Sequence, residues 1–196
     1  MQLVLLANAF FVGSVLMGFE MLGSRYIYPY FGAGIGTWAA LISVVLLALA
    51  IGYFVGAYLT SRADALRQVA VLVAVAAAYL ALVPAYADAV MSWLLNLEAG
   101  ALGQFAAALL LTLIPLSLLG TLSPVAVATL TASAEDSGAI AGWVYGVSTL
   151  GNILGVLLTT FVLVPAMGSR AITYGFAIIL AASAGVLAMA SRRVCP

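Results

Sequence analysis

Six long apolar runs dominate the chain, and each is long enough to cross a lipid bilayer. A helix needs about 20 mostly apolar residues to span the hydrocarbon core. The runs are continuously apolar, whereas the strands of a membrane β-barrel alternate over segments of about ten residues. We therefore predict an all-α, polytopic membrane protein with one transmembrane domain over residues 1–196, and with helices at roughly 3–22, 37–59, 68–86, 101–120, 139–164 and 170–190.

Charged residues fall mainly between these runs and predict how the chain is oriented. Only 6% of the residues are charged and 66% are hydrophobic, whereas a soluble domain carries about 25% charged residues. The basic residues divide unequally between the two sides, with Arg62, Arg67, Arg192 and Arg193 on one and Arg25 and Arg170 on the other. The positive-inside rule then predicts that both termini face the cytoplasm, with the chain in the inner (plasma) membrane of the cell. The first run has no positively charged segment before it, so we expect a membrane helix and not a cleaved signal peptide.

Three connections between the predicted spans have distinctive sequences. Residues 23–38 are rich in aromatic side chains and predict an external loop that contains Tyr28, Pro29, Tyr30 and Phe31. This loop is either an interfacial aromatic belt or a structured lid over a cavity. Residues 85–100 predict a short amphipathic segment on the outer surface, with Asp88 and Glu98 facing water. Residues 121–138 contain Pro124 and predict a kinked or interfacial helix in the cytoplasm, or a re-entrant segment.

Glu20 is the acidic residue that lies within an apolar run, which makes it a functional candidate. Its place in the first run puts it about 26 Å from Leu3, near the outer edge of the hydrocarbon core. Arg25 is the evident counter-charge, but five residues of helix separate the two side chains by about 140°. They can pair directly only if the helix breaks at Gly23 and Ser24. Glu20 is therefore either a structural tie between the helix end and the loop, or a substrate or proton site.

The fifth run carries a polar stripe. At 100° per residue its four members lie within about 60° of one another: Tyr145, Ser148, Asn152 and Thr159. Unsatisfied polar groups are costly in hydrocarbon, so the stripe should face other helices or a water-filled cavity. Both interpretations stay open.

Three glycine pairs with GxxxG spacing predict close helix packing: Gly52 with Gly56, Gly142 with Gly146, and Gly151 with Gly155. The last two pairs project from nearly opposite faces of the same helix. This helix is thus predicted to lie between two neighbours.

The composition argues against several classes of function. The chain has no His and a single Cys195, so we expect no metal site, no cofactor and no disulfide. A serine or cysteine nucleophile would find no histidine, and Glu135 and Asp136 are adjacent in a loop, so we expect no enzymatic activity. The net charge is zero, which gives no argument for nucleic acid.

Three stretches resemble a known family. The motif EMLGSRYIYPYFG within residues 19–64, LLGTLSPVAVATL at 118–130, and the Y-x-x-S-T-L-G-x-x-x-G helix within 141–171 are similar to the membrane region of the fused major facilitator/spermidine synthase proteins. This resemblance implies half of a major facilitator transporter, built from two inverted three-helix repeats. Ser61-Arg62-Ala63 and Ser169-Arg170-Ala171 are a faint echo of such a repeat. The soluble synthase domain of that family has no counterpart in these 196 residues, so none of its catalytic residues is carried over.

Two functions follow from the resemblance and the charges. In the first, the chain is a membrane subunit that docks a separate cytosolic synthase-like protein near Arg62, Arg67 and Arg192. In the alternative, a homodimer of six-helix halves transports a small solute, such as a polyamine, past Glu20 and the polar stripe. In both, the lipid bilayer is the immediate partner.

Overall fold

The computed structural model describes residues 1–97 and 100–192, and the regular secondary structure in these two ranges is entirely helical. Six helical stretches of this described part are long and apolar enough to cross a membrane, which confirms the predicted number of spans. They are α1 (Gln2–Phe31), α2 (Ile35–Leu59), α3 (Ala65–Leu97), the fourth span (Ala101–Leu130), the fifth span (Ser137–Ala166) and α9 (Ser169–Ser191).

The fourth and fifth spans are each built from several segments. The fourth consists of α4 (Ala101–Ala108), the π-helical η1 (Leu109–Leu113), α5 (Ile114–Gly120) and α6 (Leu122–Leu130). The fifth consists of α7 (Ser137–Leu158), the π-helical η2 (Thr159–Leu163) and α8 (Val164–Ala166). A proline follows each π-helical stretch by two residues, at Pro115 and Pro165. Proline has no backbone N–H, so it leaves a gap in the hydrogen-bond ladder at these points.

In the fourth span, a neighbouring helix fills this gap. The residue five positions after Leu110 is Pro115, which has no N–H to donate in a π-helical pattern. The hydroxyl of Tyr79, on α3, donates to the Leu110 carbonyl oxygen instead. A backbone acceptor that would be costly to leave unpaired in hydrocarbon is thereby satisfied.

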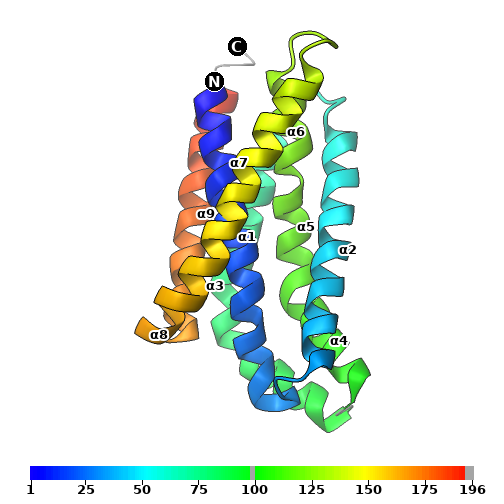
Figure 1. Ribbon diagram of the computed structural model, residues 1–196, viewed down its shortest axis with the longest axis vertical. Helices are drawn as coiled ribbons and strands as arrows, with labels where there is room; N and C mark the ends of the chain where they lie inside the picture. Colours follow the sequence, from blue (N-terminus) through cyan, green and yellow to red (C-terminus); the bar gives the residue numbers. More distant parts are fainter. Residues whose placement is uncertain (98–99, 193–196) are drawn as a thin grey trace.

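The spans alternate in direction, so the start of α1 and the end of α9 lie at the same end of the bundle (Figure 1). We call this the termini end. It also holds the turn between α2 and α3 and the connection between α6 and α7. Arg62, Arg67 and Arg192 therefore lie at the termini end, and Arg25 and Arg170 lie at the opposite end.

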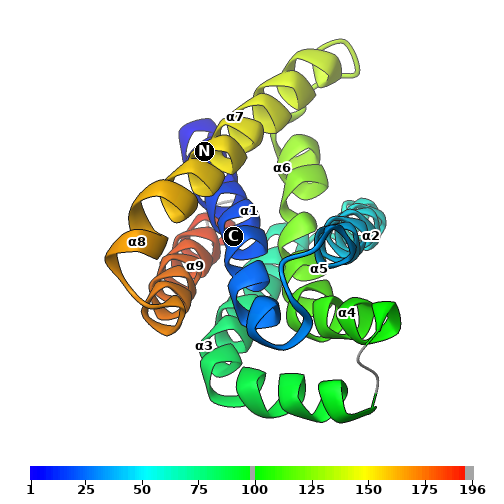
Figure 2. The same cartoon turned by 60° about the horizontal axis from the view of Figure 1, so that its bottom comes forward.

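The spans pack in three main pairs. The first span packs most extensively against the fifth, the second against the fourth, and the third against the sixth. Figure 2 shows α7 crossing α1 on one side of the bundle, with α2 next to the fourth span on the other. Buried side chains from all of these helices meet between them, and Phe19 is the largest of those that are fully buried. The outer surface is covered with exposed apolar side chains, as a lipid environment requires.

Several helices are longer than their apolar cores predict. Tyr28, Pro29, Tyr30 and Phe31, predicted as an external loop, instead form the last turn of α1. The connection to α2 is reduced to residues 32–34. Gly32 ends the helix with a φ of 75°, a conformation that glycine adopts without steric cost.

The third and fourth connections also differ from their predictions. Residues 85–97, predicted as a separate surface segment, continue α3 beyond Pro84, and the last turns of this helix run across the end of the bundle (Figure 2). Glu98 lies outside the described residues. Pro124, predicted in a cytoplasmic or re-entrant helix, belongs to α6 and thus to the fourth span. Proline is tolerated in the first turn of a helix, and Pro124 occupies that place in α6.

Candidate polar site between α1 and α7

Helices α1 and α7 touch backbone to backbone through glycines. A Cβ atom added to Gly151 would collide with the carbonyl oxygen of Phe10, and one added to Gly155 would collide with that of Ser14. No side chain larger than hydrogen fits at either position. This glycine pair therefore lies in a close backbone contact between α1 and α7.

The polar stripe of the fifth span turns toward α1 at the same crossing. A Cβ atom on Gly13 would lie 2.6 Å from the Ser148 carbonyl oxygen and 2.8 Å from Asn152 Oδ1. A Cβ atom on Gly18 would lie 2.8 Å from Thr159 Oγ1. The glycines of α1 thus make room for the polar side chains of α7 and η2.

Two of these polar atoms are buried without a hydrogen-bond partner in the described part of the chain, namely Asn152 Oδ1 and Thr159 Oγ1. A buried polar atom of this kind costs free energy unless a water or ligand reaches it. Asn152 and Ser148 line a cavity of about 30 Å³, which also touches α2 and the fourth span. This volume has room for about two water molecules.

Tyr145, the fourth member of the stripe, lies at the rim of this region. It is partly exposed, and its ring packs edge to face against that of Tyr53 on α2, with 6.2 Å between the centroids. Tyr53 also lines the small cavity. A pair of tyrosines from α2 and α7 thus lies beside the cavity that Asn152 faces.

Glu20 is buried on α1, with only 6% of its surface exposed. It forms no hydrogen bond or ion pair with a described residue, and Arg25 is exposed at the next turn. Since α1 continues unbroken to Phe31, Glu20 lies well inside the helix and not at its edge. Seven residues separate it from Gly13, so the two positions share one face of α1, about 10 Å apart along the axis. This is the face that meets Asn152.

The other two glycine pairs differ in whether a neighbouring helix packs against them. Cβ atoms on Gly52 and Gly56 would collide with the backbone of the fourth span at Ser117 and Thr121, so this pair lies in close contact with that span. Cβ atoms on Gly142 and Gly146 would meet nothing within 4 Å. Among residues 1–97 and 100–192, the Gly151 and Gly155 face of α7 has a neighbour and the Gly142 and Gly146 face has none, so the second neighbour predicted for this helix is not found there.

Polar ties at both ends of α9 were not predicted from the sequence. Ser183 Oγ donates to Asn8 Oδ1 at 2.6 Å, and the hydroxyls of Tyr26 and Thr173 lie 2.8 Å apart. Both contacts join α1 to α9. The spacing of residues within one helix gives no signal for such pairs, because each partner lies in a distant span.

The ion pair of the opposite end joins α9 to α3. Arg170 Nη2 lies 2.6 Å from Asp88 Oδ2, and the Tyr30 hydroxyl donates to Asp88 Oδ1 at 3.4 Å. The two charged side chains are 66% and 60% exposed. Water and salt screen such pairs, so their net contribution is small.

We expect Arg170→Ala to lower the free energy of unfolding by less than about 1 kcal/mol. Thermal unfolding of the purified variant in detergent measures this, with Arg25→Ala as the control for loss of charge at the same end. A much larger loss than in Arg25→Ala would show that the ion pair is a principal link between α3 and α9.

The arginines predicted to dock a partner are not equivalent. Arg62 Nη2 donates to the Tyr58 hydroxyl at 2.7 Å, and its guanidinium lies 5.3 Å from the centroid of that ring. Arg67 and Arg192 instead line a shared pocket at the termini end, with a volume of about 350 Å³. Arg193 and Cys195 lie outside the described residues.

In comparisons with known proteins, no family model, no curated protein sequence and no solved structure matches this chain.

Proposed function

We propose that the chain is one half of a membrane transporter, in which two six-helix units associate through α7 and move a small solute along the polar face of α1 and α7. The observation that carries this proposal is the low burial of the fifth span. Only 17% of its apolar window is buried within the chain, against 39–56% for the other five spans. A second unit on the open side of α7 would enclose it.

The pairing of the spans supports a half-facilitator architecture. If spans one to three and four to six are inverted repeats, the two-fold operation exchanges the first with the fourth, the second with the fifth, and the third with the sixth. The contact of span one with span five then maps onto that of span four with span two, and the contact of spans three and six maps onto itself. These are the three main pairs of the bundle.

The contacts of the glycine pairs follow the same two-fold relation between the two sets of three spans. Gly151 and Gly155, on the middle helix of the second repeat, contact the first helix of the first repeat. Gly52 and Gly56, on the middle helix of the first repeat, contact the first helix of the second. This correspondence supports the proposal that the two crossings are equivalent positions of one repeated unit.

The open face of α7 suits contact with a second helix. Gly142, Gly146, Thr149 and Ile153 lie within about 60° of one another on the side opposite Gly151 and Gly155. Small residues at this spacing let two helices approach closely in a bilayer, where dispersion contacts drive association. The proposed arrangement has the termini end in the cytoplasm and the bundle in the inner membrane, as the arginine distribution predicts.

The polar groups favour a cationic or polar solute. Glu20 is buried, unpaired among the described residues and on the α1 face that meets Asn152. A charged carboxylate is costly inside a membrane, and a bound cation would offset this cost. A polyamine, as the family resemblance implies, carries several such charges.

The assembly is tested by disulfide trapping. In a Cys195→Ser background, Thr149→Cys should form a cross-linked dimer in native membranes, because Thr149 is exposed in the middle of the open face of α7. Leu82→Cys, on the lipid-exposed side of α3, is the control and should stay monomeric. Equal cross-linking of the two variants would reject pairing through α7.

The transport activity is tested in proteoliposomes with spermidine as the probe. We expect saturable uptake that falls about tenfold or more in Glu20→Gln, equivalent to about 1.4 kcal/mol of binding. Glu135→Gln removes a carboxylate from the exposed loop at the termini end and should leave uptake unchanged. Uptake that is absent in the wild-type protein would reject spermidine transport even if the dimer forms.

A second candidate function is the docking of a cytosolic synthase-like protein at the termini end. The observation in its favour is that Arg62, Arg67 and Arg192 are all exposed at this end. Purification of the intact chain in mild detergent distinguishes the two functions by mass. A stoichiometric soluble partner, lost when the three arginines are replaced by glutamine, would support docking, and a homodimer alone would reject it.

A further inference from the structure

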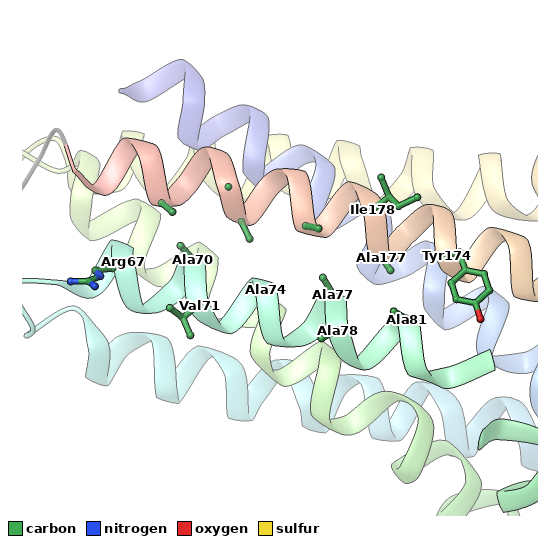
Figure 3. A pocket seen from close by; sticks show the side chains of 14 residues that line it. Arg67, Ala70, Val71, Ala74, Ala77, Ala78, Ala81, Tyr174, Ala177 and Ile178 are labelled. Atoms are coloured by element: carbon green, nitrogen blue, oxygen red, sulfur yellow. The ribbon is translucent and has the colours of Figure 1, made fainter. Parts of the chain in front are cut away.

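A long apolar groove runs along the outside of α3 and α9, away from the open face of α7. It has a volume of about 910 Å³ and is lined mainly by alanines, among them Ala74, Ala78 and Ala181. Figure 3 shows the two helices side by side, with short side chains between them, Arg67 at one end and Tyr174 near the other. The groove exists because two helices that pack through small side chains leave a trough along their outer edge.

The groove is longer than the hydrocarbon layer of one leaflet. Its α3 side runs from Arg67 to Ala81, which is about 21 Å at 1.5 Å per residue. One leaflet contributes half of a hydrocarbon core about 30 Å thick. The groove is therefore long enough to hold an acyl chain that enters from the termini end over the whole thickness of that leaflet.

The termini end of the groove meets the polar pocket described above. Arg67 and Ala188 line both hollows, so the two lie next to each other. The pocket adds the guanidinium of Arg192, the carboxylate of Asp64 and the hydroxyl of Ser191. Asp64 Oδ1 accepts a hydrogen bond from Gln68 at 2.6 Å, and neither arginine forms an ion pair with a described residue. With two guanidinium groups and one carboxylate, the pocket has a net positive charge.

We propose that the groove and pocket together form a binding site for one anionic phospholipid of the leaflet at the termini end. One acyl chain lies in the alanine groove, and the phosphate lies between Arg67 and Arg192. Arginine is suited to this task because its planar guanidinium donates two hydrogen bonds to a phosphate. Basic pockets between membrane helices at headgroup depth are a recurring form of lipid recognition.

The charge of the pocket argues for a lipid and against a second protein helix in the groove. An apolar helix would fill the groove but would leave two arginines at its end without a counter-ion. A phospholipid supplies the apolar chain and the phosphate in one molecule, at the spacing that a bilayer already imposes. The net positive charge further favours an anionic headgroup over a zwitterionic one.

The test measures lipid binding to the purified, delipidated full chain by native mass spectrometry, with phosphatidylglycerol and phosphatidylcholine of equal chain length as probes. We expect one tightly bound phosphatidylglycerol, with an affinity about tenfold or more above that of phosphatidylcholine. The double variant Arg67→Gln/Arg192→Gln should lose this preference. The matched control is Arg62→Gln, which removes a charge from the same end but lines neither hollow, and it should keep the preference.

A second variant tests the groove separately from the charges. Ala74→Phe places a large side chain at an exposed position of the groove and should reduce binding of both lipids without unfolding the chain. Equal affinity for the two lipids, or an equal loss in Arg62→Gln, would overturn the proposal. A protein dimer that Ala74→Phe dissociates would overturn it as well, because a second copy would then occupy the groove.

Discussion

The replacement of Gly155 by alanine is expected to force α1 and α7 apart and to lower the stability of the whole bundle. The added Cβ atom would collide with the backbone carbonyl of Ser14, which cannot rotate away as a side chain can. Overpacking costs about 1–3 kcal/mol, and a collision with backbone belongs at the upper end. For a chain of this size, about 3 kcal/mol lowers the melting temperature by about 6–12 °C. Thermal unfolding of the purified variant in detergent measures this change in melting temperature.

The control for this prediction is Gly175→Ala on α9, where an added Cβ atom meets nothing within 4 Å. Alanine favours a helix over glycine by about 1 kcal/mol, so the control should be as stable as the wild-type protein or slightly more stable. A Gly155→Ala variant as stable as Gly175→Ala would mean that α1 and α7 do not make backbone contact at this crossing.

The replacement of Gly52 by alanine is expected to have an effect of similar size at the other crossing. Its Cβ atom would collide with the carbonyl oxygen of Ser117 and would lie 2.9 Å from the Cα atom of Gly120. The fourth span would have to move away from α2, at a cost of about 3 kcal/mol. The same unfolding assay and the same Gly175→Ala control apply.

The double variant Gly52→Ala/Gly155→Ala helps to test whether the two glycine crossings are equivalent parts of two repeats. The two glycines lie in different helix pairs, and independent sites add to within about 0.5 kcal/mol. If the two crossings are equivalent parts of two repeated units, the single losses should match and the double loss should be their sum. A Gly52→Ala variant with no loss would contradict the equivalence of the crossings.

The number and type of the spans could be predicted from the sequence because a bilayer imposes a minimum apolar length on each. The ends of the helices could not, because that criterion sees only the hydrocarbon core. α1 and α3 continue for several turns beyond their apolar runs, where water can again satisfy the backbone. Pro29 was predicted in a loop, yet it lies inside α1.

The candidate site also has features that could be predicted from the sequence and features that could not. The helical period places Ser148, Asn152 and Thr159 on one face. The cost of unpaired polar groups in hydrocarbon predicts that this face meets another helix or a cavity. Which helix it meets depends on tertiary packing, so the role of Gly13 and Gly18 could not be predicted. The open face at Gly142 and Gly146 was missed for the opposite reason, since glycine spacing indicates a capacity for close packing and not the presence of a partner in the same chain.

The prolines and π-helical stretches of the fourth and fifth spans also determine where these spans bend most easily. A helix resists bending through its ladder of hydrogen bonds, and the ladder is weakest where a π-helical stretch precedes a proline. In the fifth span, the contact of Gly151 and Gly155 with α1 lies on one side of η2, and the link to α9 lies on the other. Bending at η2 would therefore move α8 and the link to α9 while the contact between α7 and α1 stays in place. In the fourth span, the hydrogen bond from Tyr79 ties the corresponding point to α3 and stiffens it.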